Sequence, residues 1–254
     1  MKRRLTPYLL LAFLGPVLWL QGRHARRTTP VLPEPVGPRQ GRTGRGPRLR
    51  LLIAGDSAAA GVGARTQDEA LCGQLLRNLG QHHTIEWQLM AVTGLDSPGL
   101  LKLIDEAPIT RFDVVVLSIG ANDATALCSP HQWIQWQHQL ARKIQERFEP
   151  RLLIHTALPP MHGFTALPQP LRWFMGNWAH ALNQALTLDV PQQGQRLMHA
   201  PFQGRAIGGL ASDGFHPGPN AYALWARDLS QLILARLPAP WLTPSAPENV
   251  CSEL

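Results

Sequence analysis

Short apolar runs alternate with amphipathic stretches from Leu49 onward. This alternation is typical of a parallel β-sheet with crossover helices, because the strands of such a sheet are buried on both faces. We therefore predict an α/β domain over residues 49–237. Its predicted strands are Leu49–Ala54, Ile85–Val92, Asp113–Ile119, Leu152–Thr156 and Arg196–His199.

Helix signals lie between these strands. Thr66-Gln67-Asp68-Glu69 has the pattern of a capping box and predicts a helix that runs toward Leu79. Ser97-Pro98 and Ser129-Pro130 each place a cap residue before a proline in the first turn. Two helices also carry mainly apolar residues at helical spacing, which we expect to pack on the sheet. These residues are Trp133, Gln137, Leu140, Ile144 and Phe148 in one helix, and Tyr222, Trp225, Leu229 and Ile233 in the other, between about Asn220 and Arg236.

Residues 1–27 are predicted to be an N-terminal signal or anchor segment. Lys2, Arg3 and Arg4 precede the apolar run 7–20, as in a secretory signal. No clean small-x-small cleavage site follows, so an uncleaved anchor and a removed peptide both fit, as does an interfacial helix on anionic lipid. Basic residues flank the run on both sides and give no orientation. We expect membrane association with an extracytoplasmic (periplasmic) domain, or secretion after cleavage.

Two segments flank the predicted domain. Between Thr28 and Arg48, five prolines and four glycines interleave with arginine. Such a composition does not pack a core, so residues 28–48 are predicted to be a flexible linker. Residues 238–254 are rich in proline and are expected to form an irregular tail, which includes Cys251.

The distribution of charge argues against a nucleic-acid partner. The chain has 254 residues and a formal net charge of +7, which by itself suggests nucleic-acid binding. However, residues 1–50 hold 11 of the 24 Lys and Arg but only one of the 17 Asp and Glu. The remainder is therefore slightly acidic, and no nucleic-acid binding is expected.

The cysteines and the adjacent histidines indicate neither a disulfide framework nor a metal site. Three cysteines are too few for a disulfide-stapled miniprotein, and Cys72 and Cys128 are either a pair in an exported domain or isolated thiols. The adjacent His82 and His83 face apart and lack a second ligand cluster, so no metal or other cofactor is expected.

The candidate chemistry lies at strand ends. Gly55-Asp56-Ser57 places a serine just past a buried strand, where ligands bind in open α/β sheets. Much further along the chain, Asp213 and His216 are three residues apart on one predicted loop. A catalytic serine needs a base to accept its proton and a carboxylate to orient that base, and these two residues can supply both.

Two other strand ends offer hydrogen-bond donors. Asn122 follows the third predicted strand, and its amide can donate to a developing oxyanion. Gly94 follows the second strand, where the missing side chain lets the backbone N–H approach a substrate closely. Asp56 and Asp123 are interpreted as local caps and loop braces.

With these four segments in order, residues 49–236 resemble the SGNH hydrolases, also called the GDSL family. The resemblance implies a three-layer α/β/α sandwich around a five-stranded parallel sheet of flavodoxin-like order. It implies Ser57 as nucleophile, His216 as base and Asp213 as its orienter, with the oxyanion held by the backbone N–H groups of Ser57 and Gly94 and the side chain of Asn122. Family members often carry leucine after the serine. Ala58 is smaller and opens space beside the nucleophile.

A narrower resemblance concerns the substrate. Residues 168–176 and 212–226 are similar to a bacterial subfamily that includes fatty-acyl hydrolases associated with N-acyl amino acid biosynthesis. The apolar segment Leu171–Trp178 either lines an acyl groove or lid, or belongs to ordinary helix packing.

The expected function is that of a serine hydrolase that cleaves carboxylic esters or thioesters at a membrane. Its partner would be a small-molecule or lipid-like ester substrate. A carbohydrate O-acetyl esterase and an acyltransferase are the alternatives within this chemistry, because all three form an acyl-enzyme. A non-catalytic, membrane-linked module that binds lipid or glycan is the alternative of a different class.

Overall fold

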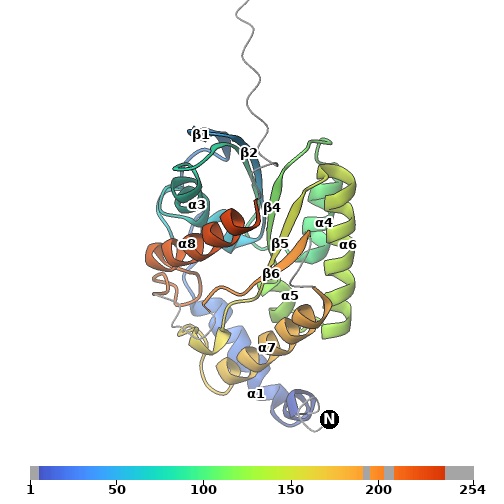
Figure 1. Cartoon of the computed structure of the whole chain (residues 1–254). Coiled ribbons are helices and arrows are strands. Elements are labelled where there is room, and N and C mark those ends of the chain that lie inside the picture. Colours follow the sequence, from blue (N-terminus) through green and yellow to red (C-terminus); the bar gives the residue numbers. More distant parts are fainter. Residues whose placement is uncertain (1–5, 191–194, 203–208, 238–254) are drawn as a thin grey trace, which may run out of the picture.

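A six-stranded sheet lies at the centre of the computed structural model, which describes residues 6–190, 195–202 and 209–237. The strand order is β1-β3-β2-β4-β5-β6, with helices on both faces (Figure 1). All neighbouring strands are parallel except β1, which is antiparallel to β3. The strands are β1 (Gln40–Gly44), β2 (Arg48–Gly55), β3 (Thr84–Ala91), β4 (Val114–Ser118), β5 (Leu152–Thr156) and β6 (Arg196–His199).

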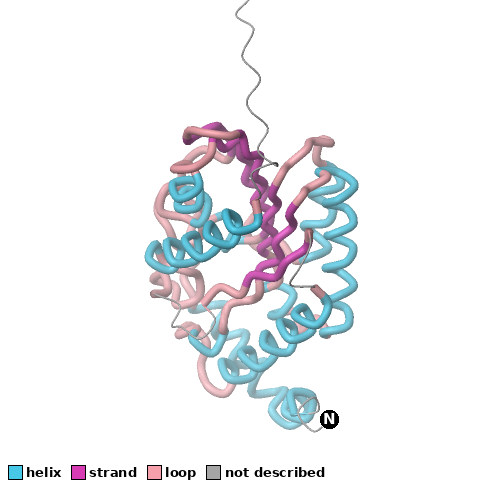
Figure 2. Tube along the Cα trace, viewed as in Figure 1, coloured by secondary structure: helices cyan, strands magenta, loops and turns pink. Residues whose placement is uncertain are grey.

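The helices form two layers around the sheet. α3 and α8 pack together on one face, and α4 packs with α6 on the other (Figures 1 and 2). α7 contacts α5, α6 and the short 3₁₀ helix η2. The helices are α1 (Thr6–Thr28), α2 (Ser57–Ala60), α3 (Leu71–Leu79), α4 (Ser97–Glu106), α5 (Ala121–Thr125), α6 (Pro130–Phe148), η2 (Met161–Gly163), α7 (Leu171–Asp189) and α8 (Pro219–Arg236).

The parallel part of the sheet agrees with the prediction. Strands β3-β2-β4-β5-β6 have the flavodoxin-like order, and each of the five predicted strands lies within one residue of its expected bounds. The apolar stripes predicted for α6 and α8 are buried. Ser129 caps α6 as expected, because its hydroxyl accepts the N–H of Gln132.

The purely parallel five-stranded sheet is a wrong prediction at one edge, where β1 adds a sixth strand. It pairs with β3 from Gln40 opposite Gln88 to Gly44 opposite Thr84. β1 lies in the segment 28–48, so the flexible linker predicted there is also wrong. A segment rich in proline and glycine cannot build a core, but it can add to an exposed sheet edge through its backbone hydrogen bonds.

Two helix starts differ from their predictions. α4 is capped by Asp96 rather than Ser97, because the Asp96 carboxylate accepts the N–H of Gly99. The capping box at Thr66 does not start a helix, and α3 begins only at Leu71. In place of a capping box, the Glu69 carboxylate accepts the N–H of Arg65.

The N-terminal helix α1 packs against α7. Leu18 and Ala25 of α1 are buried. Gln21 donates to the carbonyl oxygen of Gln169 and accepts the N–H of Leu171, the first residue of α7. Within the described residues, none of the helices combines the length and apolar character that a membrane span needs. The predicted tail, residues 238–254, lies outside the described residues.

Candidate active site

Ser57, His216 and Asp213 meet at the carboxyl edge of the sheet, although 159 residues separate Ser57 from His216 along the chain. Nε2 of His216 lies 2.8 Å from Oγ of Ser57, and Nδ1 lies 2.5 Å from Oδ2 of Asp213. The structure therefore connects the three residues that the sequence singled out in one hydrogen-bonded series.

The position of Ser57 follows from the end of β2. Gly55 passes close to β4, since a Cβ on it would lie 1.8 Å from the carbonyl oxygen of Ser118. Asp56 then caps α2 by accepting the N–H of Ala58, and Ser57 is the first residue of that helix. The N–H of a first helical residue has no partner within the helix, which leaves it available to a ligand.

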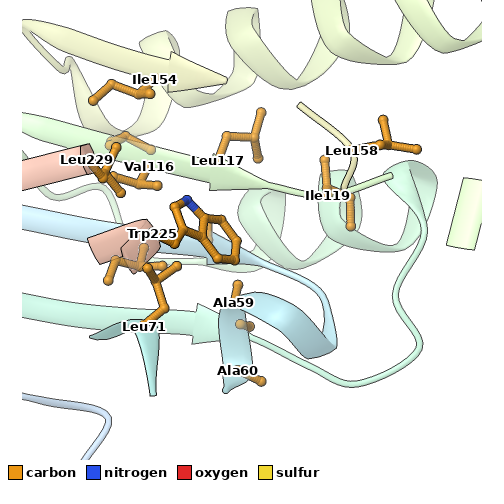
Figure 3. Close-up of a cluster of buried hydrophobic side chains, with 14 of the residues drawn as sticks. Ala59, Ala60, Leu71, Val116, Leu117, Ile119, Ile154, Leu158, Trp225 and Leu229 are labelled. Carbon is orange, nitrogen blue, oxygen red and sulfur yellow. The ribbon is translucent and has the colours of Figure 1, made fainter. Parts of the chain in front are cut away.

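The turn that carries Ser57 packs against a buried apolar cluster. Figure 3 shows Ala59 and Ala60 of α2 in one apolar cluster with Trp225 of α8 and with Val116 and Leu117 of β4. Residues with no functional chemistry thus hold α2, and with it Ser57, in place.

The two aspartates that follow strands β2 and β4 act as braces, in line with the interpretation from the sequence. Burial raises the pKa of Asp56 to about 7, because hydrogen bonds from backbone N–H groups offset only part of the desolvation. Asp123 accepts both the N–H and the hydroxyl of Ser97, which ties α5 to α4. Burial also raises the pKa of Asp123.

Hydrogen bonds from within the loop 213–216 hold the Asp213 carboxylate in position. Oδ1 of Asp213 accepts the N–H groups of Phe215 and His216, which leaves Oδ2 for the histidine ring. Burial would raise the pKa of Asp213, but the hydrogen bonds from His216 and Phe215 outweigh it and lower the pKa below its ordinary value. Asp213 is therefore ionised at neutral pH and can stabilise an imidazolium.

Asn122 lies at the start of α5, next to a glycine that the packing requires. Gly120 has φ +128°, and a Cβ on it would lie 2.4 Å from the Trp133 ring. The Asn122 amide donates to the carbonyl oxygen of Leu95 at 2.7 Å. Because the amide nitrogen carries two hydrogens, one donor remains for a ligand.

Gly94 lies on an exposed loop between β3 and α4. Its φ is +85°, and no atom lies within 4 Å of the position that a Cβ would occupy. The loop begins beside the nucleophile turn, since the N–H of Val92 donates to the carbonyl oxygen of Gly55. Hydrogen bonds and the packing of Leu95 on the core hold this loop, whereas Gly94 itself has no packing neighbour.

A partly open pocket lies beside the nucleophile, and the side chains of Ser57 and His216 line it. Ala58 lines it, and its walls are mainly apolar. The large apolar side chains of the wall are Ile119, Leu158, Phe164, Phe202, Phe215 and Trp225.

The segment 171–178 does not line this cavity. Leu171, Phe174, Met175 and Trp178 are buried in the core, so the described structure favours ordinary helix packing for them. Sequence reasoning missed most of the cavity wall. Its residues carry no reactive groups and come from distant parts of the chain, and no local pattern marks them.

Other candidate residues lie apart from this site. Cys72 and Cys128 are free thiols. Within residues 6–190, 195–202 and 209–237, His82 and His83 belong to no group of three or more potential metal ligands.

A serine, a histidine and a carboxylate in a hydrogen-bonded series at the carboxyl edge of a parallel sheet are the arrangement of a serine hydrolase. The GDSL-like lipase/acylhydrolase family matches residues 53–224 of this sequence. The chain belongs to this family and is a hydrolase that acts on ester bonds.

Solved structures share the fold at low sequence identity. A lipase, Lip_vut3, from a goat rumen metagenome is 17% identical with a TM-score of 0.53, covering 72% of this chain and 96% of its own. A carbohydrate esterase family 2 enzyme of Corynascus thermopiles is 16% identical with a TM-score of 0.61, covering 76% of this chain and 68% of its own. Est24, a carbohydrate acetylesterase from Sinorhizobium meliloti, is 14% identical with a TM-score of 0.56, covering 74% and 100%.

No curated protein matches the sequence significantly. The narrower resemblance to fatty-acyl hydrolases of N-acyl amino acid biosynthesis is not supported by these comparisons.

Proposed function

We propose that the protein is a serine esterase that works through an acyl-enzyme. Ser57 attacks the substrate carbonyl while His216 accepts the hydroxyl proton, and the ionised Asp213 stabilises the resulting imidazolium. His216 returns the proton to the leaving group, and it then activates the water that releases the acid. The observation that carries this proposal is the 2.8 Å contact between Ser57 and a histidine that Asp213 orients at 2.5 Å.

The oxyanion would be held by the backbone N–H groups of Ser57 and Gly94 and by the side chain of Asn122. Three features support these roles. Ser57 is the first residue of a helix, so its N–H has no partner within that helix. The Asn122 amide uses one of its two hydrogens on Leu95 and has the other for a ligand, and no atom lies within 4 Å of where a Cβ on Gly94 would be. Donors fixed before the reaction stabilise the charge that develops on the carbonyl oxygen without having to reorganise.

For the substrate, we propose an ester or thioester with a lipid-like acyl chain. The support is the mainly apolar cavity beside the nucleophile, together with Ala58 on its wall. The carbohydrate esterases among the similar structures make a sugar acetate the competing candidate.

The first experiment measures burst-phase release from p-nitrophenyl esters of increasing chain length, with the full chain beside Ser57→Ala. We expect a burst that requires Ser57 and a rate that rises beyond acetate. Loss of Ser57 should lower turnover by about 10⁴- to 10⁶-fold. Unchanged turnover in folded Ser57→Ala would refute the nucleophile, and activity confined to acetate would favour the carbohydrate esterase.

A second variant tests the acyl cavity directly. Ala58→Leu narrows the space beside Ser57, so we expect about a tenfold lower rate on long acyl chains, since a few misplaced methylenes are worth about 1–3 kcal/mol. Acetate hydrolysis should change little. Ala235→Leu, at an exposed position of α8, is the matched control. An equal loss at every chain length would argue that the acyl group lies elsewhere.

We further propose that the N-terminal segment holds the enzyme at a membrane, with the catalytic domain outside the cytoplasm. In support, Trp19 and Leu20 of α1 are 59% and 60% exposed, and Arg23, Arg26 and Arg27 follow them. Apolar side chains beside cationic ones favour anionic lipid surfaces. Flotation of the full chain with anionic vesicles, compared with the double variant Trp19→Asp/Leu20→Asp, tests whether this face of α1 binds lipid. Protease treatment of intact cells tests on which side of the membrane the catalytic domain lies. Equal flotation of both proteins would contradict membrane attachment through this face.

A further inference from the structure

The segment that precedes the family domain reaches the loop that carries Gly94. Glu34 lies outside the matched residues 53–224. Its Oε1 accepts two hydrogen bonds from Thr93, one from the backbone N–H at 2.8 Å and one from the hydroxyl at 2.7 Å. Thr93 is the residue directly before Gly94. A carboxylate that is distant in sequence therefore fixes the peptide that leads into the candidate oxyanion donor.

Arg39 completes this contact as a clamp. It donates to Oε2 of Glu34 at 2.8 Å and also to the carbonyl oxygen of Ala91, the last residue of β3. Arg39 directly precedes β1, which pairs with β3. The edge strand thus anchors the arginine, the arginine anchors Glu34, and Glu34 anchors the loop.

The other restraints on the loop lie at its two ends: the N–H of Val92 donates to the carbonyl oxygen of Gly55, the N–H of Leu95 donates to that of Val92, and Leu95 packs on the core. Val92, Thr93 and Gly94 are exposed, and a Cβ on Gly94 would meet open space. On its far side, the Asn122 amide donates to Leu95. With no packing at Gly94 itself, the direction of its N–H depends on how its two neighbours are held: Leu95 by the core, by Val92 and by Asn122, and Thr93 by Glu34.

We propose that Glu34, held by Arg39, is a positioning residue that aims the Gly94 N–H at the oxyanion. This inference rests on the proposed role of Gly94. Glu34 is suited to the task because it is an acceptor at neutral pH. Partial burial raises its pKa, but hydrogen bonds from Thr93 and Arg39 outweigh that effect and lower the pKa below 4.5. Charge-assisted hydrogen bonds of this kind are stronger and more directional than neutral ones.

The test compares Glu34→Ala with Glu106→Ala in the full chain. Glu106 is an exposed acid that lines the same shallow surface pocket as Glu34 and pairs with Lys102, so it controls for loss of a negative charge. On a p-nitrophenyl ester that the wild type hydrolyses, Glu34→Ala should lower kcat by about 10- to 100-fold, because a small misplacement of a catalytic group has effects of that size. KM should change little, and Glu106→Ala should match the wild type.

A transition-state analogue separates positioning from simple support of the fold. An alkyl trifluoromethyl ketone forms a tetrahedral adduct with the serine and places an oxyanion in the hole. Its inhibition constant should rise in Glu34→Ala by the same factor as kcat/KM falls, whereas inhibition by the corresponding free acid should not change. Thr93→Val, which keeps the backbone hydrogen bond, should lose about two- to fivefold by the same measures.

The outcomes distinguish this inference from the proposed function. Wild-type kcat and wild-type affinity for the ketone in folded Glu34→Ala, with hydrolysis still dependent on Ser57, would overturn the positioning role alone. A lower melting temperature with unchanged kcat of the folded protein would also overturn it, because that result assigns Glu34 to stability only. Hydrolysis that does not depend on Ser57 would instead refute the proposed function.

Discussion

The two sides of the active site are built in different ways. On the base side, Asp213 and His216 lie three residues apart, and Asp213 accepts three hydrogen bonds from within its own loop. On the oxyanion side, the loop at Gly94 has one local hydrogen bond, from the N–H of Leu95 to the carbonyl oxygen of Val92, and no packing around its glycine. It also relies on Glu34 and Asn122, which are 59 and 27 residues from the residues they bind. The base side is therefore a local motif, whereas the oxyanion side also needs distant parts of the chain.

This difference has a physical basis. In the loop 213–216, the hydrogen bonds to the Asp213 carboxylate come from the loop itself, so its conformation depends mainly on local contacts. An exposed glycine at positive φ has no side chain to pack, so other segments must restrain it, and each restraint has to be placed by the fold. We therefore expect local substitutions to affect the base side most strongly, and long-range contacts to govern the oxyanion side.

Among the substitutions that compare the two sides, Asp213→Asn is expected to have the largest effect. The amide would leave the histidine close to Ser57 but favour the wrong tautomer and remove the charge that stabilises the imidazolium, so kcat should fall by about 10⁴-fold. Steady-state kinetics on the best p-nitrophenyl ester checks this, with Asp68→Asn, an exposed acid, as the control. A loss below tenfold would mean that the base side does not depend on its local carboxylate.

Asn122→Ala is expected to have the next largest effect. It removes a candidate oxyanion donor together with the hydrogen bond to Leu95, so kcat should fall by about 10²- to 10³-fold while KM changes little. Asn177→Ala is the matched control, because its amide donates to the carbonyl oxygen of Trp173 in the same helix, away from the cavity.

Combining Asn122→Ala with Glu34→Ala sharpens the comparison between the two sides. If both residues restrain one loop, the double variant should lose less than the product of the two single losses. Full additivity would show that Glu34 and Asn122 act independently, and wild-type turnover in Asn122→Ala would remove Asn122 from the oxyanion hole.

The same contrast decides what the sequence could predict. The base-side motif and the buried strands are visible locally, since Asp213 and His216 share one loop and each strand is a continuous apolar run. Strand β1 is not, because Gln40–Gly44 contains no apolar residue and pairs only through its backbone. Nothing near Glu34 marks its partner Thr93, and nothing near Phe202 or Phe215 marks a shared cavity. Such contacts exist only once the sheet has brought distant segments together.

The smallest effect is expected from Gly94→Ala, which asks whether conformation alone places the oxyanion donor. An alanine side chain would fit at this position, because an added Cβ meets no atom within 4 Å. The cost lies in the backbone conformation, since φ +85° is unfavourable for alanine by about 1–2 kcal/mol.

If the loop keeps its shape in Gly94→Ala, the protein bears this strain and stability falls by about 1 kcal/mol with kcat unchanged. If the loop relaxes, the N–H turns away and kcat falls by about tenfold at nearly constant stability. Because Glu34 and Asn122 hold Thr93 and Leu95 on either side, we expect the first result in the wild-type background and the second in Glu34→Ala. Thermal melts and kcat of Gly94→Ala in both backgrounds measure the difference, and identical behaviour in the two would show that the hydrogen bonds at Thr93 do not hold the loop.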